Sequence, residues 1–359
     1  MMELIQSQKE KNYMTDEEIL LLDIKNRTNT LYNNYIKLID VEYPERRRQS
    51  TLEFVINDSK EINGRAWCEN ERDHIEINRG VINLYYSYFS QVLEYQKNKF
   101  LKKIMPNVDE NRIEEFSYEM VIFENQQVNC IDNKVVNSNI TKMLETFVSR
   151  FIILHELGHI FNGHCFFLSK IEKEFSYMPM YFEEENDEDE KIALDFRTLE
   201  MDADAFAVTQ SIDHVLYLYE NFESEVQIKS IEPIDLFYWW SFAIRSHFLV
   251  CEDKFNDHQY KKSMKHLPSL SRWNLNIIIA YERIDNSMLD KDLKKKIHER
   301  LISGAKNGEC VYNEIKYTNY NWINEIQNNK MDKEYVDEVN ANWKKIRDEL
   351  DKYSRLMLA

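Results

Sequence analysis

Apolar residues that recur every three or four positions predict a mostly helical protein. Such stretches run from residue 15 to about 41, from 81 to about 100, and from 333 to 357. The most apolar of the later stretches, LFYWWSFAIRSHFLV, contains an arginine and a histidine and is too short to span a bilayer. We therefore expect it to form a buried helix.

One segment has the two-residue period of a β-strand instead. The region around residues 67–78 reads as strand, and from His74 to Asn78 polar and apolar residues alternate. We propose that this segment lies at the edge of a sheet. An interior strand is the alternative, because the alternation fits both places. The patterns together predict an α+β fold that is mostly helical and has a small antiparallel or mixed sheet.

The segment FVSRFIILHELGHIF carries the clearest chemical pattern, an HExxH motif. His155 and His159 are four residues apart, so a helix places both imidazoles on one face, where they can bind one metal ion. Glu156 follows the first histidine and can act as general base toward a metal-bound water. Because the surrounding residues are apolar, the helix is expected to be buried, and Gly163 is expected to end it in a left-handed conformation.

A catalytic zinc ion needs a third protein ligand, and the segment RTLEMDADAFAV offers one. Glu200 and Asp204 share a helical face with two small alanines, which would let this helix pack against the HExxH helix. Glu200 is the candidate ligand, and Asp204 can accept a hydrogen bond from a ligand imidazole. Asp202 is expected to be a surface acid. The alternative is an ordinary amphipathic helix with its acids in water.

HELGHIFNGH followed by E-x-x-A-D resembles the gluzincin metallopeptidases, in particular the minimal HtpX-like zinc peptidases and the phage-exclusion (Lit-type) peptidases. The resemblance covers about residues 60–275. It implies a zincin-like catalytic domain, bound Zn²⁺, a protein or peptide substrate held as an added strand at a sheet edge, and a role in phage defence or as a toxin.

Three further residues are implicated by this resemblance. His164 occupies the position of an additional histidine that these families commonly carry, and we expect it to flank the site because it lies past the helix-ending glycine. His266 and Arg272 approximate a later His-Pro-Arg element, with one extra residue between the histidine and the proline. Either side chain can stabilise the oxyanion of a scissile carbonyl, and each also has an ordinary explanation as a surface histidine or an ion-paired arginine.

The composition limits which binding partners and which cellular compartment are expected. The formal net charge of -17 disfavours binding to nucleic acids and to anionic membranes. The five cysteines are scattered and odd in number, which indicates a reducing compartment, and no secretory signal is visible at the N-terminus. We therefore expect a cytoplasmic protein. The run of seven acids within residues 183–190 is expected to be solvated; a lid or an attraction for a basic substrate is the alternative.

The expected organisation is a helical N-terminal extension (residues 1–60), a metallopeptidase domain (61–275) and a helical C-terminal extension (276–359), or one compact domain. The leading hypothesis is a soluble zinc endopeptidase with His155, His159 and Glu200 as ligands and Glu156 as general base. A zinc-containing regulatory or partner-binding protein with little or tightly gated proteolysis is the alternative. A nucleic-acid-binding regulator is a third, although no basic recognition helix is evident.

Overall fold

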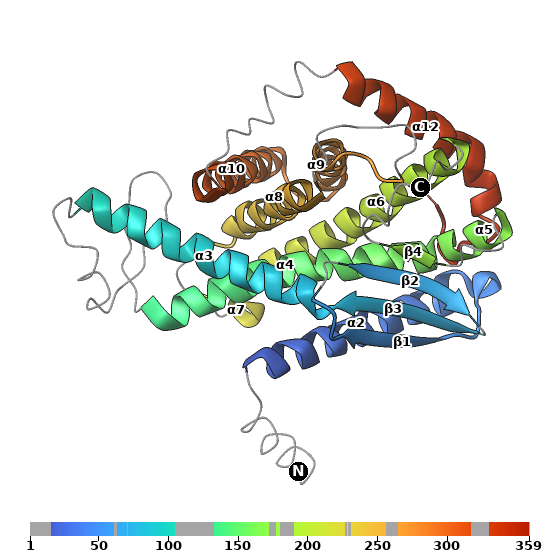
Figure 1. Cartoon of the computed structure of the whole chain (residues 1–359), viewed down its shortest axis with the longest axis horizontal. Helices are drawn as coiled ribbons and strands as arrows, with labels where there is room; N and C mark the ends of the chain where they lie inside the picture. Colours follow the sequence, from blue (N-terminus) through green and yellow to red (C-terminus); the bar gives the residue numbers. More distant parts are fainter. Residues whose placement is uncertain are drawn as a thin grey trace, which may run out of the picture. The chain divides into compact units, whose positions relative to one another are not determined.

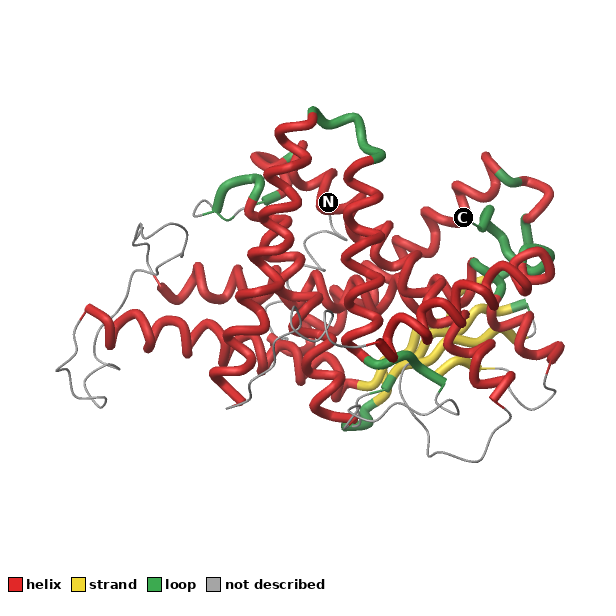
Figure 2. The backbone as a smooth tube through the Cα atoms, turned by 90° about the horizontal axis from the view of Figure 1, so that it is seen from above, coloured by secondary structure: helices red, strands yellow, loops and turns green. Residues whose placement is uncertain are grey.

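The structure is a computed structural model of the chain. It describes residues 16–60, 63–69, 71–104, 133–171, 177–179, 190–226, 228, 231–255, 265–316 and 330–358. Helices make up most of this part, and its strands form one small sheet (Figure 2). The prediction of a mostly helical α+β protein is confirmed. None of the helices within these ranges is both long and apolar enough to cross a bilayer.

The chain groups into two compact units. The first contains residues 1–81, 156–183 and 344–359, and the second contains residues 82–155 and 184–343. Three helices contribute to both units. α3 (Arg79–Ile104) passes from the first to the second after Val81, α4 (Asn133–Phe161) passes from the second to the first after His155, and α12 (Lys330–Leu350) does so after Trp343. The three-part division expected from the sequence stays a prediction.

The first unit is built on a mixed sheet with the strand order β1-β3-β2-β4. Its strands are β1 (Thr51–Asn57), β2 (Gly64–Glu69), β3 (Arg72–Asn78) and the short β4 (Tyr177–Pro179). β1 is parallel to β3, whereas β2 is antiparallel to both β3 and β4. The region around residues 67–78, predicted as strand, is divided between β2 and β3. Both strands are interior, so the placement of this segment at the sheet edge was wrong. The alternation of polar and apolar residues is the same in both positions, so the sequence pattern does not distinguish them.

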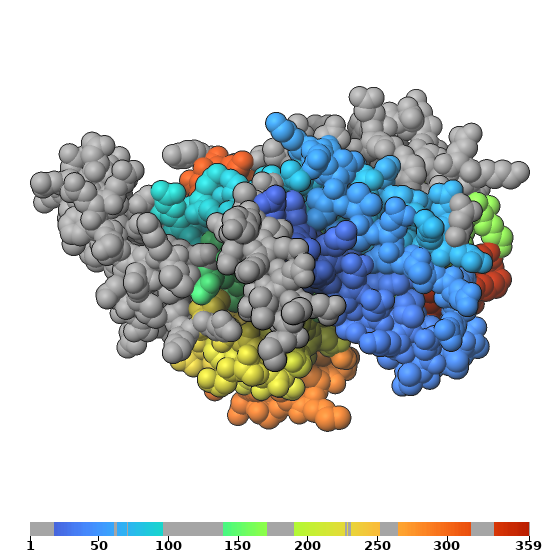
Figure 3. Space-filling view, turned by 90° about the horizontal axis from the view of Figure 1, so that it is seen from below, coloured from blue at the N-terminus to red at the C-terminus, as the bar shows by residue number. Residues whose placement is uncertain are grey.

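The alternation seen in the sequence orients β3. Asp73, Ile75 and Ile77 are buried, and the residues between them are partly exposed. Helix α2 (Asp16–Glu42) lies along the sheet and packs against β1 (Figure 1). On the side of the molecule seen in Figure 3, the residues of α2 and of the first strands form one continuous blue area. The helix predicted from residue 15 to 41 is confirmed within one residue at each end.

The C-terminal segment completes the first unit. Helix α12 ends at Leu350, earlier than the predicted end at 357, and the following residues turn back. The backbone N–H of Arg355 donates to the carbonyl of Phe161, the last residue of α4, over 2.7 Å. The Arg355 guanidinium forms two hydrogen bonds of 2.6 and 2.7 Å with the carboxylate of Asp73. Tyr32 donates to the same carboxylate, so one buried acid holds segments from both ends of the chain.

Gly163 ends the HExxH helix as predicted. It has φ +83°, in the left-handed region, and α5 (His164–Ile171) begins at the next residue. The backbone of Tyr353 lies so close that a Cβ at position 163 would be 2.5 Å from the carbonyl carbon of Tyr353. The turn therefore needs glycine for its backbone conformation and for the space it leaves.

Replacing Gly163 by alanine is expected to lower the free energy of unfolding by about 2 kcal/mol or more, because left-handed strain and a backbone clash add together. Gly308→Ala is the matched control: a Cβ there would lie 3.1 Å from the nearest atom, and alanine improves helix propensity. Chemical denaturation of both variants measures the difference. Equal stabilities for the two variants would contradict this account.

The second unit is a cluster of helices. They are most of α3 and of α4, α6 (Glu190–Glu220), α7 (Phe222–Glu225), α8 (Asp235–Phe255), α9 (Ser269–Asp285), α10 (Lys291–Lys316) and the first part of α12. The expected helices at 81–100 and in the apolar stretch at 236–250 are confirmed as α3 and α8, and α8 is largely buried. α8 approaches α10 closely at Gly304, and α9 packs against α6 and α8. This packing brings α6 and α9 together, and both carry residues of the candidate site.

Candidate metal centre

Helix α4 positions the HExxH residues. His155 and His159 lie one turn apart on this helix, and their exposed fractions are 2% and 1%. Glu156 is completely buried on the same helix. The apolar residues around the motif explain why the helix is buried, as predicted. Two imidazoles and a carboxylate in such surroundings are costly to bury unless hydrogen bonds or a cation compensate them.

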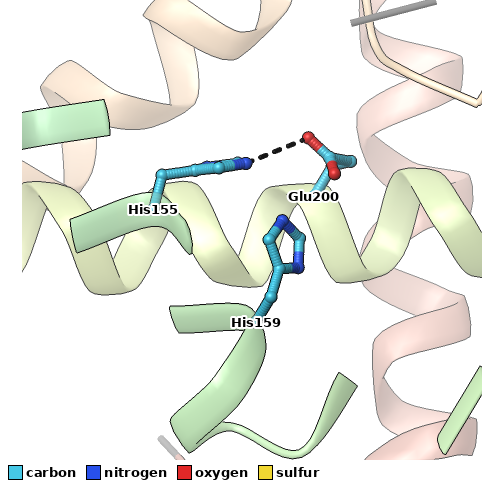
Figure 4. Close-up of side chains that lie close together, drawn as sticks. All are labelled: His155, His159 and Glu200. Carbon is cyan, nitrogen blue, oxygen red and sulfur yellow. Dashed lines mark ion pairs between the residues drawn. The ribbon is translucent and has the colours of Figure 1, made fainter. Parts of the chain in front are cut away.

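Helix α6 brings Glu200 to these histidines. One ligand atom from each of His155, His159 and Glu200 can be chosen so that all three lie within 4.8 Å of one another (Figure 4). The distance from His155 Nε2 to Glu200 Oε2 is 3.3 Å. A tetrahedral zinc ion with bonds of about 2.0–2.2 Å has its ligand atoms roughly 3.3–3.6 Å apart, so His155 and Glu200 already have the spacing of two zinc ligands. Among the described residues, it is the group of three that can hold a metal ion.

Asp204 contacts the opposite side of the His155 ring, as the sequence analysis expected. His155 Nδ1 lies 2.9 Å from Asp204 Oδ1, so Nε2 faces Glu200. Burial alone would lower the pKa of His155, but the charges of Glu200 and Asp204 and hydrogen bonds to both raise it to about 10. A metal ion that binds here therefore competes with a proton for the Nε2 atom of His155.

Arg272 binds the same Asp204 carboxylate that contacts His155. Its Nε and Nη2 atoms each donate to the carboxylate of Asp204 over 2.8 Å, and Asn276 donates to the same carboxylate over 3.4 Å. Burial raises the pKa of Asp204, but the Arg272 charge and hydrogen bonds, together with His155, hold it well below its usual range. This bidentate pair keeps Asp204 ionised and oriented toward His155. The suggested oxyanion role of Arg272 stays a prediction.

His266 contacts the candidate third ligand. Its Nδ1 atom lies 3.1 Å from Glu200 Oε2, and the Arg272 Nη2 atom lies 3.6 Å from the same oxygen. The His266 side chain is buried, which excludes its interpretation as a surface histidine. The contact indicates that His266 orients Glu200, whereas its action on a substrate carbonyl stays a prediction.

Two acidic features were predicted to be in water. Asp202 is only 9% exposed, so its interpretation as a surface acid is wrong, because α6 is buried on more than the face that carries Glu200. Of the acidic run at 183–190, only Glu190 is described, and it begins α6 with its side chain exposed. The rest of the run lies outside the described residues.

The structure adds residues that the sequence patterns did not single out. Asn276 follows Arg272 by four residues on α9, so both reach Asp204 from one helical face. The four-residue spacing of Arg272 and Asn276 is visible in the sequence, but no sequence pattern indicates that both side chains contact Asp204. His164, which opens α5, lies against His159 with 2.9 Å between their Nδ1 atoms. It flanks the site, as expected, and it is not part of the three-ligand group.

His247 lies nearby without joining the group. Its Nδ1 atom is 2.6 Å from the Tyr85 hydroxyl, inside the second unit. Burial first, and then the nearby Arg272 charge, lower the pKa of His247 to about 3. It is therefore a neutral, packed histidine.

No protein-family model matches the chain, and searches of curated proteins and of solved structures give no match either.

Proposed function

We propose that the protein is a zinc-dependent endopeptidase of the gluzincin type, with a zincin-like fold around α4. One observation carries this proposal: His155, His159 and Glu200 converge from two separate sequence segments, and Glu156 directly follows the first ligand. His₂Glu is a donor set of catalytic zinc sites, which leave one coordination position for water. A closed structural zinc site would be expected to have four protein ligands.

Different residues of the chain then have separate roles in hydrolysis. When bound, zinc lowers the pKa of water toward 7 and polarises a carbonyl oxygen. Glu156 accepts the proton of the attacking water and passes it to the leaving amine. Asp204 keeps the His155 proton on Nδ1, so that Nε2 remains available as a ligand. Arg272 neutralises Asp204, so Glu200 supplies the main negative charge toward the cation.

The substrate class follows from the resemblance. An extended protein or peptide segment would bind as an additional strand beside the sheet of the first unit. A cytoplasmic location and a role in phage defence or as a toxin belong to the same proposal, and the scattered cysteines are consistent with that compartment. Nucleic acids and anionic membranes are not expected partners of a chain with a net charge of -17.

A second function is favoured by the burial of the site. None of the three ligands is more than 2% exposed, so a substrate carbonyl does not reach them without a rearrangement. This supports a zinc-containing regulatory or partner-binding protein whose proteolysis is absent or tightly gated. An intact Glu156 supports the peptidase, because a structural metal has no use for a general base.

Comparing new protein N-termini in cells that express the wild type or Glu156→Gln distinguishes the two functions. The peptidase predicts N-termini that appear only with the wild type, together with equal zinc content in the two purified proteins. Zinc in both proteins without any wild-type-specific N-terminus, under conditions that include phage infection, would favour the regulatory function. A wild type that binds no divalent metal would refute both.

A further inference from the structure

The second zinc ligand, His159, has an outer contact that differs from that of His155. Its Nδ1 atom lies 2.9 Å from the Nδ1 atom of His164, and the two rings are steeply inclined at 67° with centroids 5.0 Å apart. Both side chains are at most 1% exposed. His155 meets a carboxylate at the corresponding ring atom, whereas His159 meets a second imidazole.

The geometry limits where the protons sit. Two ring nitrogens 2.9 Å apart share one hydrogen atom, which one nitrogen donates and the other accepts. If His159 donates, its proton is on Nδ1 and its Nε2 atom keeps a lone pair for the metal. If His164 donates, a neutral His159 carries its proton on Nε2, which blocks that atom as a ligand.

We propose that His164 is a positioning residue that accepts a hydrogen bond from His159 Nδ1–H and so fixes Nε2 as the ligand atom. This inference rests on the proposed metal centre, and it assigns His164 the task that Asp204 performs for His155. His164 as acceptor is neutral and carries its own proton on Nε2. Outer partners of this kind set the orientation and the tautomer of metal-binding histidines.

Contacts around the turn at Gly163 fix the position of His164. The left-handed Gly163 reverses the chain after α4, so the first residue of α5 returns to the level of His159. The backbone of Tyr353 packs against this glycine, and the backbone of Arg355 binds the carbonyl of Phe161. The Cys165 thiol contacts the carbonyl of His159 over 3.6 Å, next to the turn. The C-terminal segment thus fixes the turn that presents His164.

Two substitutions separate the hydrogen bond from the space that His164 fills. Asparagine places its side-chain oxygen close to the position of Nδ1 and can accept the same hydrogen bond, whereas leucine fills similar space and cannot. His164→Leu is expected to weaken zinc binding by about 10–100-fold, measured by competition with a chromophoric chelator. His164→Asn is expected to restore most of that affinity. His298→Asn, on the partly exposed surface of α10, is the control and should bind zinc like the wild type.

The tautomer gives an independent measurement. In ¹⁵N-histidine-labelled, metal-free protein, NMR distinguishes protonated from unprotonated ring nitrogens, and His159 is expected to be protonated at Nδ1 in the wild type and in His164→Asn. The cobalt-substituted His164→Leu protein should show an altered visible spectrum. If leucine prevents folding, as judged by circular dichroism, His164→Asn and the wild-type NMR spectrum decide the question.

Three results would overturn the inference: wild-type zinc affinity in His164→Leu, equal weakening by leucine and asparagine in folded proteins, or a His159 proton on Nε2 in the wild type. A wild type that binds zinc but cleaves no protein would refute the proposed peptidase activity and leave this inference standing. A wild type that binds no metal would remove its basis, whatever the tautomer.

Discussion

Replacing Glu156 by glutamine is expected to slow cleavage of a verified substrate by about 10²–10⁴-fold, the usual contribution of a general acid–base group. The amide is nearly isosteric with the carboxylate but cannot accept the water proton. Zinc affinity should stay close to that of the wild type, because the ligands are His155, His159 and Glu200. The loss should therefore fall on kcat, with little change in bound zinc.

A matched control is available on the same helix. Glu145 is also buried on α4, 1% exposed, and lies almost three turns before the motif. Glu145→Gln makes the same chemical change outside the metal site and should retain cleavage within a few-fold. Single-turnover rates with zinc content measured in parallel test the pair. Cleavage by Glu156→Gln at the wild-type rate would rule out the proposed role of Glu156.

Replacing Arg355 by alanine is expected to destabilise the protein by about 3–5 kcal/mol, the cost of removing one partner from a buried ion pair. Arg355 and Asp73 are 1% exposed each, and Arg355 supplies two of the hydrogen bonds to that carboxylate. Without the arginine, Asp73 keeps Tyr32 and Ser50 as donors but has lost its compensating charge. The protein would then unfold at lower urea concentrations, as followed by circular dichroism.

Arg46 provides the comparison for this experiment. It forms an ion pair with Asp351 at 2.9 Å in the same C-terminal segment, but the side chain of Asp351 is 40% exposed. Arg46→Ala is expected to cost about 1 kcal/mol or less, because water and salt screen exposed pairs. If the two arginine variants were equally stable, burial would not be the source of the Asp73–Arg355 contribution.

The same pair predicts a dependence on pH. Burial alone would raise the pKa of Asp73, but Arg355, Tyr32 and Ser50 lower it below its usual value. A depressed folded-state pKa means that the contribution is fully present above the unfolded-state pKa and is lost as pH falls through the folded-state value. The stability difference between wild type and Arg355→Ala should therefore be constant near pH 7 and shrink below about pH 4. An undiminished difference at pH 3 would contradict this assignment.

The sequence predicted the parts of the fold and site that depend on local spacing. The four-residue spacing placed His155 and His159 on one helical face, and the same spacing placed Glu200 and Asp204 on another. Gly163 after a buried apolar run correctly marked the end of the helix. In each case the geometry of one helix decides the outcome, so a single segment contains the information.

Long-range contacts explain what the sequence did not predict. Asp73 and Arg355 bind each other although they are 282 residues apart in the sequence, and neither belongs to a motif. The pairing of Arg272 with Asp204 depends on how α9 packs against α6, which no local period encodes. The burial of Asp202 and the interior position of β3 have the same origin, because tertiary packing decided both.

The contact between the last residues and Asp73 also bears on how the molecule is made. A ribosome that adds about 5–20 residues per second needs roughly 15–55 s to travel from Asp73 to Arg355. Until residues 353–355 are made, Asp73 lacks its arginine and the turn at Gly163 lacks its contact with the backbone of Tyr353. The first unit can therefore reach its native state only after residue 355 has been synthesised.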